Sequence, residues 1–177
     1  MAKLVAKTYG DALFEVALED GILETLTKEV KTMHQILKEN KDLSQMISHP
    51  KVSKKEKIQV LERIFKGRFS DTLVGFLILV VEKGRYTEVP AIFKHYMDRV
   101  REHMKIGVVW VTSAYPLAKK QQDKIEKRLL DTTQYKMLEM HFAVDESILG
   151  GLIIRIKDRV VDNSLKSQLK EMTKVLI

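Results

Sequence analysis

One change of hydrophobic pattern near Gly107 divides this sequence and limits the folds that it can adopt. Upstream of Gly107, apolar residues recur every three or four positions, which is the spacing of residues on one face of a helix. Downstream, the segment 106–114 reads IGVVWVTSA, and its β-branched and aromatic residues favour a strand. We therefore expect an α+β protein with an all-α domain over residues 1–105 and a small α/β domain over residues 106–177.

Helical patterns fill the first part of the chain. Ser53 and Glu56 have the spacing of a capping box, in which each side chain accepts a hydrogen bond from the other residue's backbone amide at a helix start. Ser70 or Asp71 can cap the following helix, and Pro50 stops the short third one. The predicted helices cover residues 4–19, 22–39, 43–47, 53–67, 71–84 and 89–104.

The second part predicts the order β-α-β-β-α. Strands are expected over residues 106–114, 135–144 and 151–156, and a helix over residues 116–130. Asp162, Asn163 and Ser164 offer an N-cap for a last helix that runs through Leu176. Asp158 and Asp162 bracket a tight connection over residues 157–161, where aspartates bind backbone amides in turns.

The sequence lacks the residues that several classes of enzyme and metal-binding protein require. The chain has no cysteine, which excludes disulfides, iron–sulfur ligation and thiol catalysis, and it has none of the common phosphate-loop or hydrolase motifs. Only His95 and His103 could share a helix face, and no third ligand accompanies them, so we expect no metal and no cofactor. We expect a complete, unexported bacterial protein that is not an enzyme.

The net charge of +7 leaves one alternative open, a basic nucleic-acid-binding module. The distribution of charge argues against it, because the excess is spread over both parts and there is no basic tail. The one basic cluster, Lys51 to Lys57, contains Glu56 and has the composition of a solvated helix start.

Two predicted helices have more apolar surface than a small bundle needs. On a helical wheel the apolar residues of the first helix cover roughly 200°, whereas about 100° is usual for a surface helix. The segment 73–81 is apolar nearly all round. Each helix is either buried between neighbours or covered on one side by a partner, and residues 73–81 could also form a strand.

The order of motifs resembles one family over almost the whole chain. The segment Asp145 to Gly151, followed by Asp158, Asp162, Ser164 and Leu169, resembles the signature of the delta subunit of the F-type ATP synthase, whose mitochondrial counterpart is the oligomycin-sensitivity-conferring protein. Weaker matches lie upstream, at residues 9–14, 76–77, 84–85, 92 and 109–114. Gly75 and Ala118 depart from the family pattern, where asparagine and a hydroxyl residue are usual.

The resemblance implies a stator connector with a six-helix N-terminal bundle. This bundle would bind the N-terminal segment of an alpha subunit between helices one and five, and the C-terminal domain would bind the peripheral-stalk b subunits. One monomeric copy per complex would lie on the cytoplasmic side of the bacterial inner membrane, touching the membrane only through the complex. From the two helices singled out above, the predicted alpha-subunit contacts are Tyr9, Ala12, Leu13, Val16, Phe76, Leu77 and Val80.

The remaining candidate residues form the structural signature of the C-terminal domain: Asp145, Ser147, Gly150, Gly151, Asp158, Asp162 and Ser164. We interpret the glycine pair as a turn with positive φ, or as a place of close backbone approach, before the strand 152–156. The alternative is direct contact of the glycines with a partner.

Overall fold

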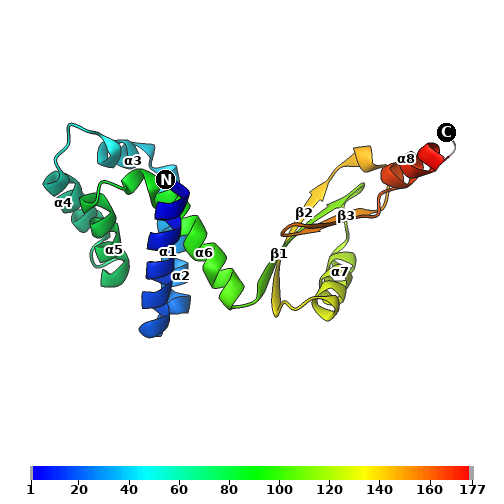
Figure 1. The fold of residues 1–177 in the computed structure, drawn as a ribbon, viewed down its shortest axis with the longest axis horizontal. Coiled ribbons are helices and arrows are strands. Elements are labelled where there is room, and N and C mark those ends of the chain that lie inside the picture. The colour runs from blue at the N-terminus through cyan, green and yellow to red at the C-terminus, as the bar shows by residue number, and fades with distance from the viewer. Residues whose placement is uncertain (1, 176–177) are drawn as a thin grey trace. The chain divides into compact units, whose positions relative to one another are not determined.

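The computed structural model describes residues 2–175, with side chains for residues 3–173. The chain forms two compact units that divide between Val100 and Arg101. The first unit is helical, as Figure 1 shows in blue to green. Its elements are α1 (Ala2–Glu19), α2 (Leu23–Glu39), α3 (Lys41–Ser48), α4 (Lys54–Phe65), α5 (Asp71–Glu82), the short 3-10 helix η1 (Tyr86–Glu88) and α6 (Val89–His103), which continues into the second unit.

The helix boundaries follow local chemistry. At the start of α4, Ser53 Oγ accepts a hydrogen bond from the Glu56 amide at 3.3 Å, and Glu56 Oε2 accepts one from the Ser53 amide at 2.9 Å, so the predicted capping box is confirmed. Ser70, rather than Asp71, caps α5 by accepting from the Leu73 amide. The Ser70 hydroxyl in turn donates to Glu29 of α2, which ties this helix start to its neighbour.

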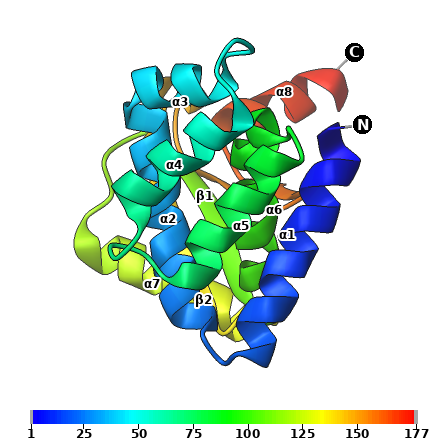
Figure 2. The ribbon, with the colours of Figure 1, turned by 90° about the vertical axis from the view of Figure 1, so that its left-hand side faces the viewer.

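The core of the first unit lies around α6 and α2. The largest fully buried side chains include Tyr96 and Phe93 of α6, Met33 of α2 and Phe65 of α4. Figure 2 shows α1 and α5 on the side of this unit that faces the viewer. The run 73–81 is a helix, as its flanking signals predicted, and not a strand.

The second unit is a four-stranded sheet with helices. Its strands β1 (Ile106–Ser113), β2 (Met137–Val144), β3 (Leu152–Ile156) and β4 (Arg159–Asp162) lie in the order β2-β1-β3-β4. Strands β1 and β2 are parallel, and the other two pairs are antiparallel. The parallel pair requires a crossover, which α7 (Lys119–Thr132) provides (Figure 1). The 3-10 helix η2 (Glu146–Ile148) and α8 (Leu165–Val175) complete the unit.

The structure corrects two predictions. The expected tight connection over residues 157–161 is a turn at Lys157 and Asp158 followed by β4. All four residues of β4 are exposed, so the strand carries no alternation of buried and exposed residues that a sequence could reveal. The helix expected from Pro116 begins only at Lys119, and Leu176, the expected end of the last helix, lies outside the described residues.

Candidate functional site

Helices α1 and α5 meet through an aromatic pair on their outer side. The rings of Tyr9 and Phe76 pack edge to face, with centroids 6.4 Å apart. Both rings are only half-buried. This contact joins two rows of exposed or half-exposed residues, one on each helix, into one continuous surface.

The row on α1 consists of Val5, Tyr9, Ala12 and Val16, spaced as neighbours on one helix face. The row on α5 consists of Gly75, Phe76 and Leu79. We call these seven residues the α1–α5 face. No member carries a charge, and Val16 and Leu79 are 40% and 44% exposed, so the face is apolar surface left open to solvent.

The structure divides the seven predicted alpha-subunit contacts. Tyr9, Ala12, Val16 and Phe76 belong to the α1–α5 face, where a partner can reach them. The other three, Leu13, Leu77 and Val80, are at most 2% exposed and pack into the unit's own core beneath that face. They can support the surface from below, but they cannot touch a partner unless the unit rearranges.

The opposite side of α1 is fixed to α6. A side chain at Gly10 would put its Cβ 2.8 Å from the His95 ring and 3.2 Å from the Ile92 carbonyl oxygen, so the two helices approach closely because position 10 is glycine. Next to it, Asp11 Oδ1 lies 2.9 Å from His95 Nε2 and 3.0 Å from Arg99 Nε. The hydrogen bond from His95 lowers the pKa of Asp11, aided by the positive charge nearby. The small residue at position 10 therefore serves an internal contact.

In the second unit, the signature acids hold backbone amides. Asp145 is the N-cap of η2, and its Oδ1 accepts a hydrogen bond from the Ser147 amide. Hydrogen bonds from the side chain and the backbone of Ser147 lower the pKa of Asp145. Asp162 accepts from the Ser164 amide and from the Ser167 hydroxyl, which lowers the pKa of Asp162 at the start of α8. The turn-and-cap interpretation is thus confirmed for Asp162, whereas Asp158 lies exposed in the β3–β4 turn.

The glycine pair fits against the start of α8. Gly151 has φ +80°, and a Cβ there would lie 2.1 Å from the Asn163 carbonyl oxygen. Gly150 accepts a hydrogen bond from the Leu165 amide through its carbonyl, and Ser164 beside it is buried. Positive φ and close backbone approach are both present at Gly151, so the structural interpretation is confirmed for that glycine, whereas a Cβ at Gly150 would meet only the Leu165 side chain.

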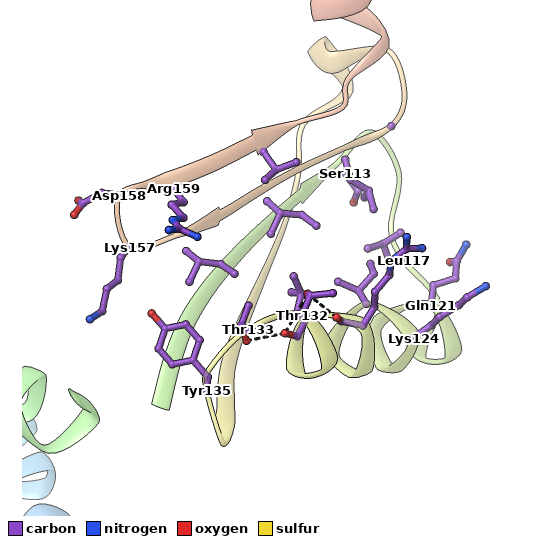
Figure 3. Close-up of a pocket in the computed structure, with 18 of the residues that line it drawn as sticks. Ser113, Leu117, Gln121, Lys124, Thr132, Thr133, Tyr135, Lys157, Asp158 and Arg159 are labelled. Atoms are coloured by element: carbon purple, nitrogen blue, oxygen red, sulfur yellow. Dashed lines mark hydrogen bonds between the residues drawn. The ribbon is translucent and has the colours of Figure 1, made fainter. Parts of the chain in front are cut away.

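A large pocket opens between α7 and the β3–β4 hairpin, as Figure 3 shows. Its volume is about 1430 Å³. Apolar side chains line it, among them Leu117 just before α7, Ile125 and Leu129 of α7, and Ile154, Ile156 and Val161 of the hairpin. Basic residues stand at its edge: Lys105, Lys124, Arg128, Lys157 and Arg159. Ile125 and Leu129 lie one turn apart on α7, whereas Leu117 precedes the helix, although the predicted helix 116–130 included it.

Two further properties of the described residues concern metal binding and membrane crossing. No group of three or more His, Asp or Glu side chains within the described part of the chain could hold a metal ion. Among the helices that the structure describes, none is long and apolar enough to cross a membrane.

Comparison with known families decides the assignment. The model of the ATP synthase delta (OSCP) subunit family matches residues 5–176. The chain belongs to this family. The family resemblance seen in the sequence is therefore confirmed, and members of the family connect the ATP synthase head to its peripheral stalk.

Relatives from this family match along their full length. ATP synthase subunit delta of Lachnoclostridium phytofermentans is 50% identical over 176 residues, which cover 99% of this chain and 97% of that protein. The corresponding subunit of Halalkalibacterium halodurans is 32% identical and covers 98% of this chain and 94% of that protein. These comparisons give no support to the alternative of a nucleic-acid-binding module.

The fold is shared with a chain of a solved ATP synthase structure. A chain in the cryo-EM structure of the Toxoplasma gondii mitochondrial ATP synthase hexamer aligns with a TM-score of 0.68 at 21% identity, covering 97% of this chain and 96% of that one. At this identity the likeness concerns the fold alone. It agrees with the α+β class that the sequence predicts.

Proposed function

We propose that this chain is the non-catalytic stator connector of a bacterial F-type ATP synthase and that each of its two units binds one partner. The observation that carries the proposal is the presence of one open apolar surface on each unit: the α1–α5 face and the α7 pocket. A connector needs two separate binding surfaces, whereas an enzyme needs converging reactive groups.

The first unit binds the N-terminal segment of an alpha subunit on the α1–α5 face, and helices α1–α6 act together as the bundle expected for the family. The face suits an amphipathic helix, because two uncharged rows flank the Tyr9–Phe76 contact. Ala12 has only a methyl side chain and Gly75 has none, which lets the backbone of a partner helix come close. Leu13, Leu77 and Val80 keep the two helices in place from beneath.

The second unit binds the C-terminal ends of the peripheral-stalk b subunits. The pocket beside α7 supports this assignment, because it is the large apolar opening found in that unit among the described residues. Residues of the structural signature lie around the α8 start, where they shape the domain.

The mechanism is mechanical restraint. Rotation of the central rotor drives ATP synthesis only if the head cannot turn with it, so each joint must outlast many catalytic cycles. A nanomolar dissociation constant corresponds to about 12 kcal/mol, which a few well-buried apolar anchors can supply. One monomeric copy per complex is sufficient for this role, without cofactor or nucleic acid.

The chain would lie on the cytoplasmic side of the bacterial inner membrane and contact the membrane only through the complex. The test uses membranes carrying the ATP synthase of the same organism from which this chain has been stripped. We expect ATP-driven ion pumping to be lost and then restored by adding the purified chain. Pumping that is unaffected by removal, or salt-sensitive binding of duplex DNA without binding to stripped ATP synthase, would contradict the proposal.

A further inference from the structure

The apolar residues that line the pocket of the second unit are not fully buried by the rest of that unit. No residue of α7, all of which the structure describes, is fully buried, although Ile125 and Leu129 line the pocket. On the hairpin side, Ile154 and Ile156 are only half-buried, and Val161 is 63% exposed. Apolar residues of α7 and of the facing β3–β4 hairpin thus remain accessible to solvent, whereas the interior of a folded domain is normally close-packed.

The size of the pocket favours a polypeptide over a small molecule. Sites for small ligands have volumes of about 300–1,000 Å³. The volume here, about 1430 Å³, is larger. An α-helix with side chains is about 11 Å wide and rises 1.5 Å per residue, so ten residues occupy a cylinder of roughly 1,400 Å³. The volume of the pocket is therefore comparable to that of about three turns of a helix.

The charged residues that line the pocket are mostly basic, so they favour a partner helix that carries acidic side chains. Five lining residues are basic and exposed: Lys105, Lys124, Arg128, Lys157 and Arg159. The acidic lining residues are Glu102 and Asp158. Two of the basic residues, Lys124 and Arg128, lie one helical turn apart on α7 beside Ile125 and Leu129, so positive charge runs beside these apolar residues.

Taking the stator role proposed above as given, we propose that the pocket binds an amphipathic helix of the peripheral stalk whose apolar stripe is flanked by aspartate and glutamate. The apolar side chains enter between α7 and the β3–β4 hairpin and supply most of the affinity. The carboxylates meet the basic edge, which orients the helix and speeds its association. Acidic flanks are thus a requirement that the pocket places on its partner.

The experiment measures binding of the soluble part of the b subunits from the same ATP synthase to the full chain by calorimetry at about 0.05 M and 0.5 M salt. The test variant carries Lys124→Gln and Arg128→Gln. The matched control carries Lys120→Gln and Lys127→Gln, which remove the same charge from exposed positions of α7 that do not line the pocket. A third variant, Val161→Asp, places a charge at an exposed apolar position of β4 that lines the pocket.

We expect the test variant to weaken binding about tenfold at low salt and much less at high salt, because exposed ion pairs are modest in strength and screened by salt. The control should stay within about twofold of the parent. Val161→Asp should abolish most binding at both salt concentrations.

Equal affinity of the test variant and the control, without salt dependence, would overturn the acidic-helix inference and leave the stator role standing. Unchanged affinity of Val161→Asp would show that the pocket is not the stalk site. Failure of the unmodified chain to bind the b subunits, while ion pumping still depends on the chain, would overturn this inference and the assignment of the second unit's partner. The add-back experiment with stripped membranes tests the connector role separately.

Discussion

Asp11 Oδ1 lies 2.9 Å from His95 Nε2, and this contact links α1 to α6 behind the α1–α5 face. Arg99 approaches the same oxygen to 3.0 Å, and its guanidinium group also lies over the Phe14 ring, 5.3 Å from the ring centroid. The outer face of α1 is therefore presented by a helix whose inner side is fixed by charge as well as by packing.

This relationship predicts a pH-dependent stability. Because the pKa of Asp11 is lowered in the folded chain, its carboxylate stabilises the fold above the ordinary pKa of aspartate. That contribution is lost as pH falls through the lowered pKa. Asp11→Asn should cost about 1–2 kcal/mol of unfolding free energy at neutral pH and progressively less as pH falls through the lowered pKa of Asp11, measured by urea denaturation. Asp20→Asn, an exposed change at the end of the same helix, should have little effect at either pH. A cost for Asp11→Asn that does not depend on pH would contradict this account.

The glycine pair gives a stability prediction with an internal control. Gly151→Ala should destabilise the chain by roughly 3 kcal/mol, because the new Cβ would overlap the Asn163 carbonyl oxygen and the residue needs φ +80°. Gly75→Ala should instead stabilise it by about 0.5–1 kcal/mol, because Gly75 lies inside α5 with nothing within 4 Å of a new Cβ. Thermal unfolding of both variants decides the matter: similar melting temperatures would mean that the close contact at Gly151 is not a constraint.

The α1–α5 face predicts where a charge blocks the alpha subunit. Ala12→Asp places a carboxylate in the middle of the apolar face at an exposed position, so the chain should fold normally and bind an alpha-subunit N-terminal peptide about tenfold more weakly or worse. Leu4→Asp is the matched control, since Leu4 is 70% exposed on α1 but is not part of the face. Calorimetry that shows the same affinity for both variants would remove the face as the binding site.

Asp162 predicts local protection of the α8 start. Asp162→Ala removes the acceptor of the Ser164 amide and the Ser167 hydroxyl, so backbone amides at the beginning of α8 should exchange with solvent faster. Asp158→Ala in the neighbouring turn should leave them unchanged. The pKa of Asp162 is lowered by these bonds, so the protection should be present at neutral pH and fade as pH falls through that value. Equal exchange in the two variants, followed by NMR, would refute the cap.

The sequence was most informative where a residue type has one physical use. Ser53 with Glu56, and Gly151 before a strand, predicted a cap and a close turn that the structure contains. The sequence could not predict which side of an apolar helix is buried by the rest of the chain and which side stays exposed. Leu13, Leu77 and Val80 have the same character as Val16 and Leu79, and only the three-dimensional packing separates the buried residues from the open ones.

The pocket could not be predicted, because its walls come from segments far apart in the sequence. Ile125 and Leu129 have the spacing of one helix side, but nothing in that pattern indicates that the facing sheet leaves space beside them. Strand β4, which provides Val161, was missed because a strand with four exposed residues has no hydrophobic period.

The incomplete cover of α7 has a consequence for proteolysis. Because no side chain of α7 is fully buried, local unfolding of this helix should cost little free energy. Proteases cut a chain where it unfolds locally most often. We therefore expect a protease added to the isolated chain to cut first within α7, and a stalk helix bound in the neighbouring pocket to slow that cut.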